Sequence, residues 1–175
     1  LVQTYNYSDF SMIPVVYQQF KFYSLITIKS RQIRQIPDLV FANFCLNQID
    51  LSENQIEYIS NQSFHQLIFL KELILSKNRI WSIESFFKAI HVDSLTYLDL
   101  SNNLIRSIPS KLSNNIGNLE ALNLNSNNIE QIDDSAFDMF EKLRTLQLEG
   151  NLLKSISDGM FSGLVNLESL SLQHN

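Results

Sequence analysis

The stretch LEALNLNSN, which occupies residues 119–127, decides the fold of this 175-residue chain. It has the form L-x-x-L-x-L-x-x-N, and this form occurs six times at a spacing of about 24 residues. The copies begin at Leu46, Leu70, Leu95, Leu119, Leu143 and Leu167. Each places an asparagine eight residues later: Asn54, Asn78, Asn103, Asn127, Asn151 and Asn175. A pattern that returns at a fixed period of this size predicts a stack of similar structural units.

Each unit contributes a short strand whose leucines face the interior. In the copy at residues 119–127, Leu119, Leu122 and Leu124 point inward, and one repeat alone is too small to enclose them. Stacked neighbours close this core, and their strands then lie in parallel about 4.8 Å apart. The residues between the leucines face outward and form columns across the resulting sheet.

The pattern resembles the leucine-rich repeat family from about Tyr23 to Asn175. This resemblance implies an α/β solenoid, a leucine-rich repeat horseshoe with a concave parallel β-sheet and an irregular or short-helical convex side. We expect six full repeats starting at residues 23, 46, 70, 95, 119 and 143 and a truncated repeat at 167. Residues 1–22 are expected to form a degenerate repeat or an N-terminal lead-in.

The resemblance also assigns a role to the repeat asparagines. It implies that they form a ladder of hydrogen bonds to buried main-chain groups of the turns, because an unpaired buried group costs roughly 1–3 kcal/mol. In the repeat that begins at residue 23, Arg31 stands in place of the ladder asparagine, which marks that repeat as atypical.

Apolar residues at fixed offsets in the second half of each repeat are expected to pack the convex side. The sets in the last two full repeats are Ile129, Ile132, Phe137 and Phe140, and Leu153, Ile156, Phe161 and Leu164. The repeat at Leu70 is one residue longer and carries Phe86, Phe87, Ile90 and Val92. We expect Trp81 to cover a neighbouring repeat, and residues 113–117 to form a convex loop.

Composition limits the partners of the chain. With 13 basic and 18 acidic residues and a net charge of -5, the sequence has no basic stripe, so nucleic acid is not expected as a main partner. No stretch of 18 apolar residues occurs, so no direct membrane contact is expected in this segment. The single cysteine, Cys45, cannot form an internal disulfide and is expected to fill space beside Phe44.

The sequence offers no arrangement of residues suited to catalysis. His65, His91 and His174 fall in different repeats without metal-ligand spacing, and there is no G-x-S-x-G motif or glycine-rich phosphate loop. We therefore expect a segment that is not an enzyme and that holds no metal or cofactor.

Several features favour an extracellular or cell-surface protein. The repeat length and the I-x-x-I and F-x-x-L spacing resemble the extracellular animal class, as in Toll-like receptors, Slit and chaoptin-like adhesion proteins. Asn6-Tyr7-Ser8 and Asn61-Gln62-Ser63 match the N-glycosylation pattern. Cysteine-rich caps are missing, so we expect an interior section of a longer membrane or secreted protein.

The outward columns of the concave sheet are the expected ligand surface. The candidate contact residues are Asp50, Glu72, Ile74, Tyr97, Asp99, Asn123 and Gln147. Ile74 and Tyr97 are the apolar anchors, flanked by acidic residues, as in a contact hot spot. The alternative interpretation is that both are ordinary surface residues.

These observations predict a protein-binding segment of a cell-surface receptor or adhesion protein, which recognises a protein ligand or co-receptor through the concave face. The alternative is an intracellular adaptor or regulatory scaffold, in which the glycosylation patterns are accidental. A third class is the repeat arm of an enzyme whose catalytic domain lies elsewhere. The parent of such a segment can also form a homodimer, as receptors of this class commonly do.

Overall fold

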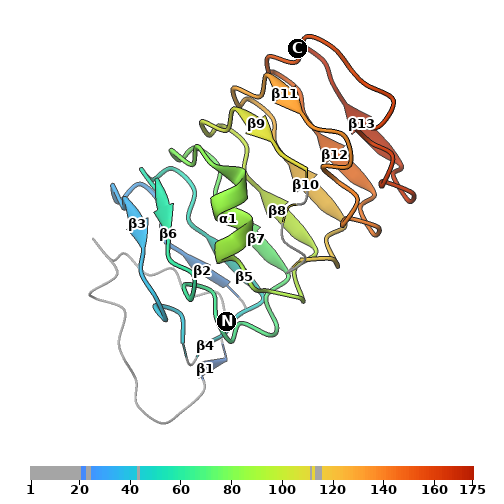
Figure 1. The fold of residues 1–175 in the computed structure, drawn as a ribbon. Helices are drawn as coiled ribbons and strands as arrows, with labels where there is room; N and C mark the ends of the chain where they lie inside the picture. Colours follow the sequence, from blue (N-terminus) through green and yellow to red (C-terminus); the bar gives the residue numbers. More distant parts are fainter. Residues whose placement is uncertain (1–20, 23–24, 43, 111, 113–115) are drawn as a thin grey trace.

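The computed structural model describes residues 21–22, 25–42, 44–110, 112 and 116–175. Three expected features lie wholly or partly outside this part of the chain: residues 1–20 of the degenerate repeat or lead-in expected at 1–22, the glycosylation pattern at Asn6, and residues 113–115 of the convex loop. The described residues form one curved stack of repeats that runs from the first sheet strand to Asn175 (Figure 1).

A parallel sheet of seven strands forms one side of the stack. Its order is β13-β12-β10-β8-β7-β5-β2, so strands that follow one another along the sheet also lie in successive repeats. The strands are β2 (Leu25–Thr27), β5 (Gln48–Asp50), β7 (Glu72–Ile74), β8 (Tyr97–Asp99), β10 (Ala121–Asn123), β12 (Thr145–Gln147) and β13 (Ser169–Ser171). A further pair, β1 (Lys21–Phe22) and β4 (Phe44–Cys45), lies apart from this sheet. The predicted solenoid with a parallel sheet is confirmed.

The interior is a single apolar core shared by all the described repeats. Leu119, Leu122 and Leu124 are almost fully buried, as are their equivalents in the neighbouring repeats. On the side opposite the sheet, phenylalanine rings of successive repeats stack on one another. The Phe41 and Phe64 rings are 5.8 Å apart, and the Phe137 and Phe161 rings are 6.0 Å apart. Because each repeat is covered by its neighbours, the stability of the stack depends on the contacts between adjacent repeats.

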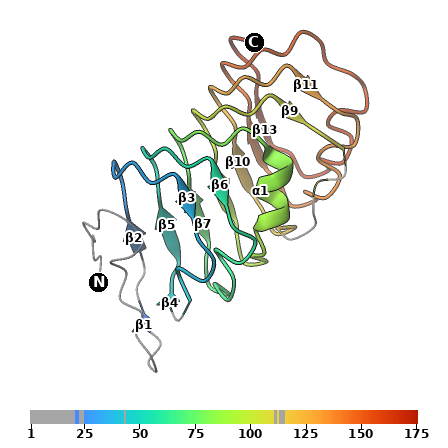
Figure 2. The ribbon, with the colours of Figure 1, turned by 60° about the vertical axis from the view of Figure 1, so that its left-hand side comes forward.

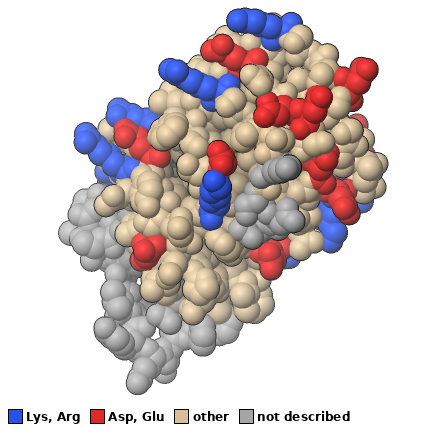
Figure 3. All heavy atoms as spheres, in the orientation of Figure 1, with Lys and Arg blue, Asp and Glu red and all other residues tan. Residues whose placement is uncertain are grey.

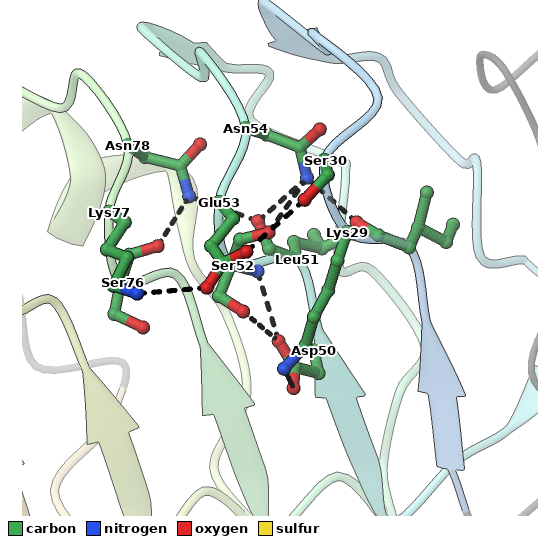
Figure 4. Close-up of polar contacts among 11 residues, drawn as sticks. Lys29, Ser30, Asp50, Leu51, Ser52, Glu53, Asn54, Ser76, Lys77 and Asn78 are labelled. Atoms are coloured by element: carbon green, nitrogen blue, oxygen red, sulfur yellow. Dashed lines mark hydrogen bonds and ion pairs between the residues drawn. The ribbon is translucent and has the colours of Figure 1, made fainter.

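The repeat asparagines connect the turns of adjacent repeats. Asn127 donates from Nδ2 to the Leu100 carbonyl at 3.0 Å and to the Leu124 carbonyl at 3.1 Å. Its Oδ1 accepts from the Ile105 amide at 3.1 Å. Asn54, Asn78, Asn103, Asn151 and Asn175 repeat this arrangement one unit apart, and Figure 4 shows it for Asn54 and Asn78. In the atypical first repeat, the Arg31 and Ile33 amides both donate to Asn54 Oδ1.

Within the described residues, the convex side is built from two-residue strands and one helix. β3 (Gln35–Ile36) pairs with β6 (Tyr58–Ile59), and β9 (Ser107–Ile108) pairs with β11 (Gln131–Ile132). Helix α1 (Ile83–Ala89) stands between these two pairs (Figure 2).

Local sequence explains why the longest repeat forms this helix. Ser82 caps the helix by accepting a hydrogen bond from the Ser85 amide, and Lys88 pairs with Glu84 one turn away at 2.6 Å. Phe86 and Phe87 are buried and take the places that phenylalanines occupy in the shorter repeats. The extra residue of this repeat is thus absorbed in a helical turn.

Two sequence expectations for the convex side are wrong. Trp81 does not cover a neighbouring repeat, because 64% of its surface is exposed. The residue before it, Ile80, is buried and fills the core position, so the next side chain points to solvent. Ile156 was expected in the convex core and is 59% exposed, since no later repeat in this sequence packs on it.

Cys45 lies on β4, where it is partly buried and has a free thiol. This agrees with a space-filling position rather than a disulfide.

Candidate functional site

The outward side chains of the sheet stand in two straight columns. One column follows the first residue of each strand, and strand pairing aligns Glu72 with Tyr97 and Tyr97 with Ala121. The other follows the last residue, and it aligns Ile74 with Asp99 and Asp99 with Asn123. Both columns run in register over all seven strands. The backbone therefore holds a fixed array of side chains on the concave face.

Asp50 is not the free contact residue that the sequence suggested. It is 8% exposed, and its Oδ2 accepts from Lys29 Nζ at 2.7 Å. Its Oδ1 accepts from the Ser52 amide at 3.0 Å and from the Ser52 hydroxyl at 2.7 Å (Figure 4). With both oxygens engaged, this carboxylate stabilises the turn after β5 and adds little to a contact surface.

The same turn bond occurs at two other candidate residues. Asp99 Oδ1 accepts from the Ser101 amide at 2.9 Å, and Asn123 Oδ1 accepts from the Asn125 amide at 3.0 Å. Aspartate and asparagine side chains commonly accept from an amide two residues later. The spacing Asp-x-Ser or Asn-x-Asn at the strand end is visible in the sequence and signals this bond, which the sequence analysis missed.

Tyr97 is the centre of the remaining candidates. It lies on β8 beside Glu72 of β7, with Asp99 two residues along on the same face. Burial raises the pKa of the Tyr97 hydroxyl, and the charges of Asp99 and Glu72 raise it further, while a hydrogen bond with the Asn123 side chain lowers it. Strand pairing sets Glu72 beside Tyr97, and Asp99 follows on the same face, so both carboxylates border the Tyr97 side chain.

We call Glu72, Tyr97 and Asp99 the acidic tyrosine cluster. Glu72 is exposed, whereas Tyr97 and Asp99 are half-buried. Among the residues that the structure describes, neither carboxylate of the cluster forms an ion pair with a basic side chain. The cluster thus presents uncompensated negative charge around an aromatic ring.

The other two sequence candidates border this cluster. Ile74 is half-buried and lies directly opposite Asp99, diagonal to Tyr97. Gln147 lies on β12, two strands from Tyr97, and is paired with Asn123. The structure therefore brings Ile74 and Asn123 next to the cluster and leaves Gln147 at its margin.

Charges along the neighbouring rim are paired within the chain. Glu53 accepts from Lys77 Nζ at 2.9 Å and from the Ser30 hydroxyl at 3.2 Å (Figure 4). The hydrogen bond and charge of Lys77, with smaller effects of Ser30 and Lys29, lower the pKa of the Glu53 carboxyl below its ordinary value of 4.5. The first three repeats thus have a charge-balanced rim, in contrast to the acidic tyrosine cluster.

The glycosylation pattern at Asn61 lies on the convex side, in the turn after β6. The Asn61 side chain is exposed. Ser63 of the same pattern is fully buried, and its hydroxyl donates to the Ile36 carbonyl at 2.7 Å. Ser63 therefore has a structural role besides any part in modification.

In the described part of the chain, no three His, Cys, Asp or Glu side chains lie close enough together to hold a metal ion. None of the helices in this part has the length and apolar character needed to cross a bilayer.

A family profile for the leucine-rich repeat matches residues 68–129 and 117–175. The chain therefore belongs to the leucine-rich repeat family. A curated relative, leucine-rich repeat-containing protein 3 of Danio rerio, is 37% identical over 90 residues. That match covers 50% of this chain and 32% of the relative, so the chain spans about a third of that protein.

Solved structures with the same fold include three complexes. A chain of the TLR13-ssRNA13 complex is 26% identical, with a TM-score of 0.66, and the match covers 86% of this chain and 25% of that one. A chain of the octameric complex of Latrophilin 3, Unc5D and FLRT2 (LRR) is 33% identical, with a TM-score of 0.68 and coverages of 82% and 44%. A chain of the Drosophila Toll-Spatzle complex is 22% identical, with a TM-score of 0.69 and coverages of 86% and 25%, which shows a shared fold. These neighbours confirm the resemblance to extracellular animal receptors with leucine-rich repeats.

Proposed function

We propose that this segment recognises a protein ligand through its concave face, as part of a cell-surface receptor or adhesion protein. The observation that carries the proposal is the acidic tyrosine cluster, in which Glu72 and Asp99 flank Tyr97 and lack basic partners among the described residues. Leucine-rich repeat chains of the Toll-Spatzle and Latrophilin 3-Unc5D-FLRT2 complexes, which share this fold, occur with protein partners.

The chemistry of the cluster favours a basic side chain on the ligand. An arginine or lysine over the Tyr97 ring gains a cation-π contact of about 0.5–2 kcal/mol and can pair with both carboxylates. Ile74 and Asn123 supply an apolar contact and a hydrogen-bonding amide at the edge of the same contact area. Such a small group of anchors commonly provides most of the affinity of a protein interface.

The rigidity of the sheet also supports binding. All seven strands are held in register by main-chain hydrogen bonds and by the core beneath them. Because the backbone of the site is already ordered, binding does not have to fix it, and less free energy is lost on association.

An extracellular location is part of the proposal. It is supported by the likeness to receptor ectodomains and by the exposed Asn61 of the glycosylation pattern. The alternative, an intracellular adaptor, predicts an unmodified Asn61 and a reduced Cys45. A homodimer of the parent remains a prediction, since no described residue identifies a dimer interface.

The test is binding of the secreted chain to an array of cell-surface and secreted protein ectodomains. Proteins that bind are then compared on the wild type, on Tyr97→Ala and on Glu72→Gln/Asp99→Asn. The matched control is Thr145→Ala, which changes the same column two strands away. We expect both cluster variants to weaken binding at least about tenfold and the control to leave it unchanged. Ligands that bind all four proteins equally would show that the concave cluster is not the site.

A further inference from the structure

The convex ladder of short strands is interrupted at the third full repeat. The Arg79 main-chain amide still donates to the Ile56 carbonyl, and the Leu104 amide donates to the Ile80 carbonyl, as in regular repeats. Beyond Trp81 the chain turns into α1, and in the described part of the chain β6 and β9 have no strand partner on the side of the helix. The interruption leaves a depression on each side of Trp81.

Both depressions are lined by Trp81. The one toward the following repeat has a volume of about 620 Å³ and includes Leu104 and Pro109. The one toward the preceding repeat has a volume of about 530 Å³, and we call it the Tyr58 hollow. It is lined by Tyr58 of β6 and Asn61 of the turn after it, and by Trp81 and Phe86 from the next repeat.

The Tyr58 hollow exposes two aromatic side chains. Tyr58 is 60% and Trp81 is 64% exposed, while the phenylalanines that stack between repeats are largely buried. The charges at its margin are paired with each other, Arg79 with Glu57 and Lys88 with Glu84. Figure 3 shows this face, on which basic and acidic side chains are interspersed. An occupant of the hollow should therefore be uncharged and should offer both apolar and polar groups.

We infer that an N-linked glycan on Asn61 folds back over the Tyr58 hollow and that its core sugars cover Trp81 and Tyr58. The inference rests on the extracellular location proposed above. Asn61 lines the hollow itself, so a sugar attached to it starts at the edge of the aromatic surface. A pyranose ring has a face of C–H groups that packs on aromatic rings, and a rim of hydroxyls that hydrogen-bonds. Ser85, Lys88 and Glu57 provide polar partners around this hollow.

The attachment itself is an ordinary transfer from a lipid-pyrophosphate-linked oligosaccharide. Asn61 Nδ2 forms a bond to the anomeric carbon of the first sugar, the lipid pyrophosphate leaves, and one amide proton is released. Ser63 is buried and bonded to the Ile36 carbonyl in the folded chain. The transfer therefore has to precede folding of this turn, and the attached glycan then settles on the hollow as the repeats assemble.

Trp81 is the only tryptophan of the sequence, so its fluorescence reports on the hollow directly. The experiment compares acrylamide quenching of the full chain secreted from animal cells with that of Asn61→Gln. Asn61→Gln is preferred over Ser63→Ala because Asn61 is exposed, whereas Ser63 is bonded in the interior. Asn6→Gln, which removes the other glycosylation pattern, is the matched control. Occupancy of both asparagines is measured by intact mass and peptide mapping.

We expect the quenching constant of Trp81 to be about twofold higher in Asn61→Gln than in the wild type and unchanged in Asn6→Gln, because a bulky glycan screens the ring. Trimming the glycan to its first sugar should keep part of the protection. Equal quenching in the wild type and Asn61→Gln with an occupied Asn61 would overturn this inference and leave the proposed receptor role intact. A secreted protein with Asn61 unmodified would also overturn it, whereas failure to enter the secretory pathway would overturn both.

Discussion

Replacing Asn127 with alanine should destabilise the solenoid more than any exposed substitution. The change removes the hydrogen bonds from Nδ2 to the Leu100 and Leu124 carbonyls, a longer one at 3.4 Å to the Asn125 carbonyl, and the bond that Oδ1 accepts from the Ile105 amide. Asn127 is 5% exposed, so the Ile105 amide is left without a partner in the interior. The Leu100 and Leu124 carbonyls each lose one bond but still accept from Asn103 and Asn151, respectively. Each unpaired buried group costs roughly 1–3 kcal/mol. The lost bonds to the two carbonyls add about 0.5–1.5 kcal/mol each, and a water molecule admitted by the smaller side chain can satisfy part of the loss. We therefore expect a decrease of about 2–4 kcal/mol in the free energy of unfolding.

The assay is urea denaturation followed by far-ultraviolet circular dichroism, combined with hydrogen exchange of the Ile105 amide. The matched control is Asn128→Ala, because the Asn128 amide donates to the Ile105 carbonyl through the main chain and alanine keeps that bond. We expect the control to lie within about 0.5 kcal/mol of the wild type. An Asn127→Ala protein as stable as this control, with unchanged exchange at Ile105, would refute the idea that the asparagine satisfies the interior of the turn.

Three further predictions concern the core, the cluster and the rim. Leu122→Ala should lower the free energy of unfolding by about 2–5 kcal/mol in the same denaturation assay, because it empties a buried core position. Tyr97→Ala should change the thermal midpoint by less than about 2 °C while it weakens ligand binding, since its ring lies on the surface of the sheet. The Glu53 carboxyl should titrate below 4.5 in nuclear magnetic resonance experiments, and Lys77→Ala should raise its pKa. The pKa of Glu53 is lower in the folded protein than in the unfolded chain. The ionised Glu53 therefore stabilises the fold at a pH above its unfolded pKa, and this stabilisation is lost as the pH falls through its folded pKa. A Glu53 titration unchanged by Lys77→Ala would show that the ion pair does not form in solution.

The columns of the concave face could be predicted because spacing alone determines them. Once Leu98 and Leu122 face inward in register, Tyr97 and Ala121 must lie side by side on the outer surface. The same counting placed the asparagines at the turns. Neither result depends on which side chains are nearby.

The role of Asp50 could not be predicted from spacing because it depends on a contact between repeats. Asp50 and Asp99 occupy the same column, yet among the described residues Asp50 alone of the two pairs with a lysine, Lys29 of the preceding repeat. Burial and charge pairing depend on which residues are neighbours in space, and the sequence of a single repeat does not reveal those neighbours. The turn bond to Ser52, by contrast, is local and was open to prediction.

Trp81 shows a different limit of sequence reasoning. A large apolar residue next to a core position is most often buried, and on that basis Trp81 was expected to cover a neighbour. Its direction is set instead by Ile80, which fills the core, and by α1, which replaces the regular convex strand after it. The helix is itself a consequence of one extra residue and a serine cap, and such a departure from the repeat changes the exposure of the residues around it.

The most direct test of the central claim is photo-crosslinking from the concave face of the secreted chain on animal cells. A photoreactive residue is placed at Tyr97, and in a matched protein at the exposed convex residue Glu130 just before β11. Our account predicts that position 97 captures a cell-surface or secreted protein and that a Glu72→Gln/Asp99→Asn background reduces this capture. Capture of the same partner from position 130 and not from position 97 would contradict it.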